Sequence, residues 1–179
     1  MSVFDTLDYL KTGNALQQKS YDLLTAHSVL ELLSDFDPIL VGTIPIDIAI
    51  ESSDLDIGCY WKDKNGFIAT LHKAFSEYQD YSCQELDNGA MEAIVANFSI
   101  DGIAIEIFGQ NIPTREQNGY RHMLIEHRIL QVRGAAFREA VVALKKSGIK
   151  TEPAFAQLLQ IEGDPYQGLL QWEQDSGVL

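Results

Sequence analysis

Three carboxylates on two predicted strands have the residue types and the spacing of a metal site. Asp54 and Asp56 lie two residues apart in one apolar strand, and Glu106 lies within another. Side chains two residues apart on a strand point to the same face, so the two aspartates are expected side by side. Carboxylates this close repel each other unless a positive charge lies between them. A divalent hard cation, which prefers oxygen ligands, would supply that charge, and Glu106 would complete its site.

A second interpretation of the same residues involves no metal. On half-exposed strands, Asp56 and Glu106 would simply face the solvent. Glu106 shares its strand face with Ala104 and Phe108, and a lone carboxylate there indicates either a wet surface or the lining of a site. Both interpretations stay open at this stage.

The net charge limits the classes of partner. The chain has 179 residues and a formal net charge of −13. Nucleic-acid backbones and anionic membranes attract basic surfaces, so neither is expected as a general partner. All five arginines fall within residues 115–138, however, which leaves small anionic substrates possible.

The composition predicts a folded chain in a reducing compartment. Apolar residues make up 46% of the sequence, and the length predicts one domain or one domain with a small appendage. Cys59 and Cys83 are expected to be reduced thiols. No signal peptide opens the chain, and no apolar run reaches the roughly 20 residues that span a bilayer. We therefore expect a soluble, cytoplasmic protein.

The first 112 residues predict helices followed by mixed strands. Residues 1–35 favour helix, with Asn14 as the N-cap of a second helix and a break near residues 27–28. Asp101-Gly102 lies between two alternating apolar runs, which is typical of a two-residue hairpin. The other expected elements are strands at 39–42, 54–61 and 81–86, an extended segment at Ile46–Ile50, a helix at 67–78, and hairpin arms at 93–100 and 103–108.

After Pro113 the pattern is helical to the end of the chain. Helices are expected at 120–132 and 135–146, with further ones beginning near Pro153 and Asp164-Pro165. The fold class is therefore α+β, a small mixed sheet with flanking helices and a C-terminal helical tail. We expect a core at 1–112 and a helical extension at 113–179 packed on it, or one single domain.

The helix that begins at Tyr120 carries a second candidate site. Ile125, Ile129 and Val132 form the stripe expected to face the core. His122 and Glu126 lie on an adjoining stripe, one turn apart, where they can hydrogen-bond and fix the imidazole tautomer.

Two interpretations of this helix are open. In one, the stripe is the wall of a substrate pocket, and Arg121, Arg128 or Arg133 binds a phosphate or a carboxylate. In the other, these are solvated helix charges, or an anchor between the tail and the sheet.

Taken in order, the motifs resemble those of the polymerase-beta-like nucleotidyltransferase superfamily. Its hallmark is a Gly-Gly or Gly-Ser turn, about ten residues, an acidic-x-acidic pair on a strand, and a third acid on a later strand. Here these are Gly42-Thr43, Asp54-Leu55-Asp56 and Glu106. Over nearly its whole length, including Arg121–Arg128, the chain is similar to a small bacterial family of that superfamily with no assigned function.

The resemblance implies a nucleotidyltransferase-like fold and a metal-dependent transfer of a nucleotidyl group. The donor would be an NTP, and the acceptor a small molecule or a protein. Asp54, Asp56 and Glu106 would hold Mg²⁺ or Mn²⁺, and Glu106 would help remove the proton of the attacking hydroxyl. The backbone of Gly42 and the hydroxyl of Thr43, with Ser53, would contact the nucleotide phosphates.

The sequence also departs from the superfamily pattern. Thr43 replaces the usual Gly or Ser, residues 44–50 contain no cation, and Glu106 stands in place of Asp. These departures support an alternative, a catalytically silent binding or antitoxin-type protein with a protein partner. A homo-oligomer whose acids are incidental is a third hypothesis.

Overall fold

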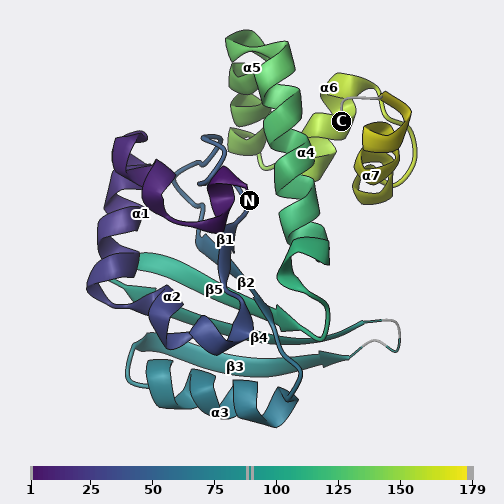
Figure 1. Cartoon of the computed structure of the whole chain (residues 1–179). Coiled ribbons are helices and arrows are strands. Elements are labelled where there is room, and N and C mark those ends of the chain that lie inside the picture. Colours follow the sequence, from purple (N-terminus) through teal and green to yellow (C-terminus); the bar gives the residue numbers. More distant parts are fainter. Residues whose placement is uncertain (1, 88, 90, 177–179) are drawn as a thin grey trace.

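The structure, a computed structural model that describes residues 2–87, 89 and 91–176, is built on a five-stranded mixed sheet (Figure 1). The strand order is β1-β2-β5-β4-β3. β2 and β5 are parallel, and the other neighbouring strands are antiparallel. The strands are β1 (Ile39–Val41), β2 (Leu55–Tyr60), β3 (Gln79–Asp87), β4 (Glu92–Ile100) and β5 (Ile103–Gln110). The predicted α+β class is confirmed.

One face of the sheet is covered by the helices that come early in the chain. These are α1 (Ala15–Ala26), α2 (Val29–Leu32) and α3 (Lys64–Phe75). Alternation along the strands sends Leu55 and Ile57 to this face, where they are buried with apolar side chains of β4 and β5. α3 contributes its buried aromatic and aliphatic side chains at intervals of four, namely Phe67, Leu71 and Phe75.

The C-terminal helices form a second core around β1. They are α4 (Asn118–Arg133), α5 (Ala135–Lys146), α6 (Thr151–Leu159) and α7 (Pro165–Ser176), and they gather on one side of the molecule in Figure 1. Their apolar side chains pack against Ile39 and Val41 of β1 and against Ile46 and Ile48 of the following loop. The tail therefore packs over the β1 end of the sheet.

The predicted hairpin is confirmed. β4 and β5 pair with Ile100 opposite Ile103, and Asp101 and Gly102 form the turn with φ angles of 50° and 75°. Both residues lie in the left-handed region that a two-residue turn requires. The expected cap is also present, since the Asn14 side chain accepts a hydrogen bond from the Gln17 amide at 2.9 Å.

Two local predictions are wrong. The segment Ile46–Ile50 forms no strand: residues 43–47 form turns, and Ile44, Ile46 and Ile48 are buried in the two cores. Val132, expected in the core stripe of α4, is 69% exposed, because it lies in the last turn of the helix, next to Gly134.

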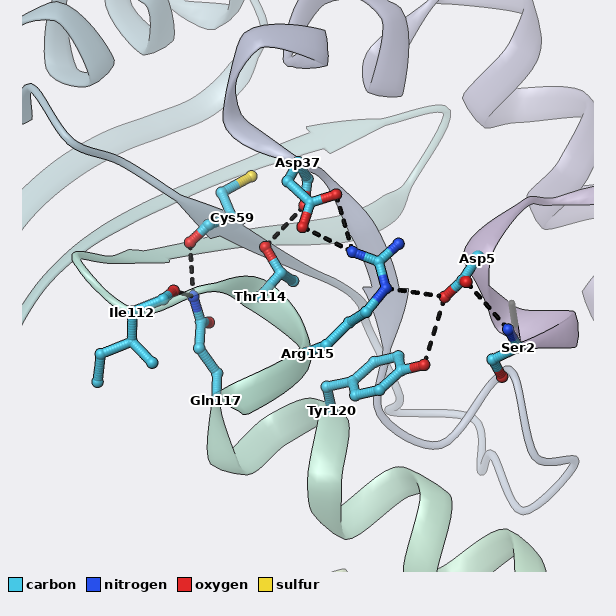
Figure 2. A network of polar contacts seen from close by, with 9 residues as sticks. All are labelled: Ser2, Asp5, Asp37, Cys59, Ile112, Thr114, Arg115, Gln117 and Tyr120. Carbon is cyan, nitrogen blue, oxygen red and sulfur yellow. Dashed lines mark hydrogen bonds and ion pairs between the residues drawn. The ribbon is translucent and has the colours of Figure 1, made fainter.

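The start of α4 is fixed to the sheet by hydrogen bonds to backbone carbonyls (Figure 2). The Thr114 hydroxyl donates to the Asp37 carbonyl at 2.7 Å. The Gln117 amide donates to the carbonyls of Cys59 and Ile112, both at 2.8 Å. Both side chains are buried, so these bonds fix the position at which the chain leaves the sheet and enters α4.

An ion network ties the same region to the first turn of the chain (Figure 2). Arg115 pairs with Asp37 at 2.8 Å and with Asp5 at 3.3 Å. The Tyr120 hydroxyl also donates to Asp5, at 3.3 Å. Asp5 thus joins the N-terminal segment to α4, and the first of the five arginines has a structural partner.

Candidate functional site

Asp56 and Glu106 lie side by side on the face of the sheet opposite α3. In the parallel register of β2 and β5 they are direct partners, and Asn97 of β4 is the partner of Glu106 on the other side. Adjacent strands lie about 4.8 Å apart, so the two carboxyl groups are neighbours on one face. Within the described part of the chain, no arginine or lysine forms an ion pair with either of them.

The two carboxyl groups are held in an unfavourable electrostatic environment. Burial raises the pKa of Asp56 to about 8, and the charges of Asp54 and Glu106 act in the same direction. Burial and then Asp54 also raise the pKa of Glu106. Lys145 opposes the shift at Asp56 only in part. A cation between these groups would relieve this repulsion.

Asp54 lies just before β2 and takes part through its charge. It acts on the pKa of both other acids, but it is not among the residues that line the cavity described below. Over residues 2–87, 89 and 91–176, no three His, Cys, Asp or Glu side chains come close enough together to hold one metal ion. The structure therefore pairs Asp56 with Glu106 and leaves Asp54 adjacent to the pair.

Gly42, which directly follows β1, lies against the Asp56 carboxylate. Its φ angle is +78°, a conformation that side chains with a Cβ rarely adopt. A Cβ built at this position would overlap Asp56 Oδ2. Glycine is therefore favoured at this position for two reasons. It can adopt the positive φ angle, and it leaves room for the Asp56 carboxylate.

Thr43 and Ser53 close the loop that follows Gly42. The Thr43 hydroxyl donates to Ser53 Oγ at 3.3 Å, and Ser53 Oγ accepts the Ile50 amide at 3.0 Å. Gly42 and Thr43 line the cavity, whereas Ser53 does not. Through these two hydrogen bonds, Ser53 joins the two ends of the loop.

Two cations from α5 bind this loop, although its own residues 44–50 include none. Arg138 donates to the carbonyls of Ile46 and Asp47 at 2.6 and 2.8 Å. The buried Lys145 ammonium donates to the Ile48 carbonyl at 2.8 Å. Neither set of contacts could be predicted from the sequence, because the contacts join residues more than 90 positions apart and no local pattern indicates them.

Lys145 also interacts electrostatically with the acidic residues. Burial lowers the pKa of its ammonium group, while Glu126, Asp56, Glu152 and Asp54, in that order, favour its charged form. Its charge therefore acts on carboxylates of the sheet and on those of the helical tail.

A cavity of about 940 Å³ opens over the Asp56 and Glu106 carboxylates. It is lined by residues of the sheet, of the segment that leads into α4, of α4 itself, and of the starts of α6 and α7. The polar side chains that line it include Thr43, Asp56, Glu106, Gln110, Thr114, Glu116, Gln117, Asn118, Tyr120, His122, Glu126, Lys150, Thr151, Glu152 and Tyr166. The volume is that of a small-molecule or nucleotide site.

The buried imidazole of His122 does not pair with Glu126 as expected. Its Nε2 lies 3.0 Å from the Tyr166 carbonyl, and its Nδ1 lies 3.8 Å from Glu152 Oε1. A carbonyl oxygen only accepts, so Nε2 carries a proton. The tautomer is thus set by α7, which lies across from α4, and sequence spacing along one helix could not reveal this partner.

Glu126 is one of the most deeply buried charged residues. Its side chain lines the cavity, the residue is 3% exposed, and Oε1 has no hydrogen-bond partner. Burial and then the charge of Glu152 raise its pKa well above the ordinary value, while Lys145 acts in the opposite direction.

The three arginines of α4 that were candidate substrate-binding residues lie outside the cavity lining. Arg121, Arg128 and Arg133 do not line the cavity, and Arg133 is exposed in the last turn of α4. At that position its charge is favourable to the helix dipole. The structure thus joins His122 and Glu126 to the carboxylate face and leaves the arginines outside it.

Comparison with known proteins identifies the fold. The model of a family described as "Domain of unknown function (DUF4269)" matches residues 22–172. The Cid1 poly(U) polymerase bound to MgGTP is 12% identical, with a TM-score of 0.54 over 86% of this chain and 48% of that one. A chain of the GLD-2/RNP-8 complex is 14% identical, with a TM-score of 0.55 over 86% of this chain and 61% of that one. Cid1 in complex with the UTP analogue UMPNPP is 16% identical, with a TM-score of 0.51 over 86% and 46%.

These likenesses show the nucleotidyltransferase fold, which is the fold that the sequence motifs imply. This chain spans about half the length of the Cid1 chains that it matches. No curated protein matches it. Of the described helices, none has the length and apolar character needed to cross a membrane. Cys59 and Cys83 are both free.

Proposed function

We propose that this chain, which belongs to the DUF4269 family, is a metal-dependent nucleotidyltransferase that moves a nucleotidyl group from an NTP to a small-molecule or protein acceptor. One observation carries the proposal: two adjacent carboxylates that form no ion pair in the described chain line a nucleotide-sized cavity, against the glycine of a tight turn. The fold agrees with it.

Asp54, Asp56 and Glu106 are the residues that would hold Mg²⁺ or Mn²⁺. The donor set fits such an ion, because carboxylate oxygens are the ligands that hard cations prefer and because Asp56 forms no ion pair with an arginine or lysine in the described chain. When bound, the ion would neutralise the triphosphate charge and polarise its oxygens.

The remaining roles fall to the loop and to Glu106. The backbone N–H groups of Gly42 and Thr43, with the Thr43 hydroxyl, would bind the terminal phosphates, and Ser53 would hold Thr43 in place. Glu106 would act as the general base that takes the proton of the attacking hydroxyl. Arg121, Arg128 and Arg133 have no part in the proposal.

Binding of nucleotide tests this directly. Each of the four NTPs is added with Mg²⁺, and the melting temperature is measured by differential scanning fluorimetry. At least one NTP is expected to raise it, and Asp54→Asn with Asp56→Asn is expected to abolish the rise. Asp22→Asn, an exposed aspartate on α1, is the matched control and should keep the full response. No shift with any NTP would contradict the proposal.

A second candidate is a catalytically silent binding or antitoxin-type protein. It is favoured by the separation of Asp54 from the cavity lining and by a phosphate loop filled with buried isoleucines. In that case a partner should co-purify in stoichiometric amount, and Asp54→Ala with Asp56→Ala should leave both the complex and its biological effect intact. Loss of the biological effect in this double variant would instead favour a catalytic role. A homo-oligomer is the weaker third candidate, and solution scattering tests it.

The proposed compartment is the cytoplasm. Nucleoside triphosphates are available there, and the two free thiols are compatible with its reducing conditions. Detection of the tagged protein after cell fractionation would test this.

A further inference from the structure

The helical wall of the cavity carries carboxyl groups of its own. Glu126 comes from α4 and Glu152 from the first turn of α6, and both line the cavity. They are close enough that the charge of Glu152 raises the pKa of Glu126. A nucleotide bound at the carboxylates of the sheet leaves this second acidic group without a role.

A carboxylate oxygen on this wall lacks a hydrogen-bond donor. Glu126 Oε1 is buried and has no partner. Glu152 Oε1 lies 3.8 Å from His122 Nδ1, with which it pairs when the imidazole is protonated. Two carboxyl groups therefore line the same space, and the buried one has an oxygen that accepts no hydrogen bond. Buried acceptors are normally satisfied, so this arrangement favours a ligand that brings several N–H groups.

Lys145 does not supply these N–H groups. Its ammonium group donates to the Ile48 carbonyl, and it forms no ion pair within 4 Å of Glu126 or Glu152 in the described chain. The positive end of the α6 dipole does not create an anion site either, because Glu152 itself occupies the first turn. With carboxylates on both walls, a phosphate-rich acceptor would be repelled.

We infer that the acceptor is a small hydroxyl compound with an ammonium group, and that Glu126 and Glu152 bind this ammonium while its hydroxyl faces Glu106. The inference rests on the proposed function and names the class of its acceptor. In the transfer, the hydroxyl oxygen would bond to the α-phosphorus, pyrophosphate would leave, and the hydroxyl proton would pass to Glu106. The ammonium group is not consumed.

Calorimetric titration with a pair of matched probes tests the inference. 1,3-Diaminopropan-2-ol carries two ammonium groups and one hydroxyl, and glycerol has the same skeleton without the charges. With saturating Mg²⁺, the diamine is expected to bind and glycerol is not. Glu126→Gln and Glu152→Gln should each weaken the diamine at least about tenfold, because each removes one charge partner. Glu139→Gln, on the exposed side of α5, should leave its affinity unchanged.

The outcomes separate this inference from the proposed function. Equal affinity for both probes, or full diamine binding in Glu152→Gln and Glu126→Gln, would overturn the inference. So would diamine binding that is lost only in Asp54→Asn with Asp56→Asn, because the amine would then occupy the sheet carboxylates. If Mg²⁺ and NTP still raise the melting temperature in those cases, only the ammonium site is refuted. If no NTP binds, the proposed function fails, and the acceptor assignment fails with it.

Discussion

Gly42 and Asp56 are in such close contact that position 42 has no room for a side chain. The carboxylate occupies the space that a side chain at position 42 would take. This contact keeps the turn close to the acids, which a phosphate-binding role requires. It also makes the glycine testable separately from any activity.

We expect Gly42→Ala to lower the free energy of unfolding by about 2–4 kcal/mol, since it combines a strained φ angle with an overlap against Asp56. Gly102→Ala is the matched control, because Gly102 has a similar φ of +75° but no atom within 4 Å of the added Cβ. It should cost only the strain, about 1–2 kcal/mol. Urea denaturation measures both, and equal losses would show that the contact with Asp56 is unimportant.

The raised pKa of Asp56 makes the metal-free protein sensitive to alkaline pH. The folded pKa of about 8 lies above the ordinary value of 3.8, so the contribution of this group is fully present below pH 3.8 and is lost as the pH rises through 8. Asp56→Asn should therefore stabilise the protein at pH 8.5, by at most about 6 kcal/mol, and hardly at all at pH 4.

The measurement is urea denaturation across this pH range in the presence of a chelator. Mg²⁺ should remove most of the difference between wild type and Asp56→Asn at pH 8.5, since a bound cation favours the ionised carboxylates. A wild-type stability curve that runs parallel to that of Asp56→Asn at every pH would contradict the prediction.

At the scale of elements, the loop after β1 depends on α5. Lys145 and Arg138 bind the carbonyls of the loop from the helical side, and Thr43 and Ser53 close its ends. The geometry of the proposed phosphate loop is therefore set partly by a helix that begins almost 100 residues later. The tail supports the site as well as forming its second wall.

Lys145→Met should lower the free energy of unfolding by about 1–3 kcal/mol, since it leaves the Ile48 carbonyl buried and unpaired. It should also speed hydrogen exchange at the Ile48 amide, which donates to the Thr43 carbonyl at 3.2 Å. Lys146→Met, at the exposed neighbouring position, should change neither quantity. Unchanged Ile48 exchange in Lys145→Met would mean that the loop holds its shape without α5.

Local sequence signals predicted the elements but not their long-range contacts. The β4–β5 hairpin follows from Asp101-Gly102 and two alternating runs, and the cap at Asn14 follows from its residue type. The residue types predicted that Glu106 lies near the aspartates, but not the parallel pairing of β2 with β5, because no local pattern fixes which strands become neighbours. The partners of Lys145 and His122 could not be predicted, since they lie on other elements.

At the scale of the whole molecule, two cores hold the chain together. The first lies between the sheet and α1 to α3, and the second joins β1 and the loop after it to α4 to α7. The proposed division at residues 112 and 113 therefore crosses a shared apolar interface. Each part would expose a large apolar surface without the other.

A chain that ends at residue 112 is expected not to fold cooperatively, since it would leave Ile39, Val41, Ile46 and Ile48 without cover. Circular dichroism with thermal melting, together with binding of a hydrophobic dye, would show this. Residues 1–176 are the control and should melt as the full chain does. A sharp, reversible transition in residues 1–112 would instead establish an independent core.

The parallel pairing of β2 with β5 also governs when the site comes into existence during folding. Asp56 and Glu106 lie fifty positions apart along the chain. The intervening segment, which includes β3 and β4, must fold before the two residues can come together. Contacts of such separation form late and slowly. A refolding chain should therefore acquire its helices and its hairpin first, and the ability to capture Mg²⁺ only in the final phase.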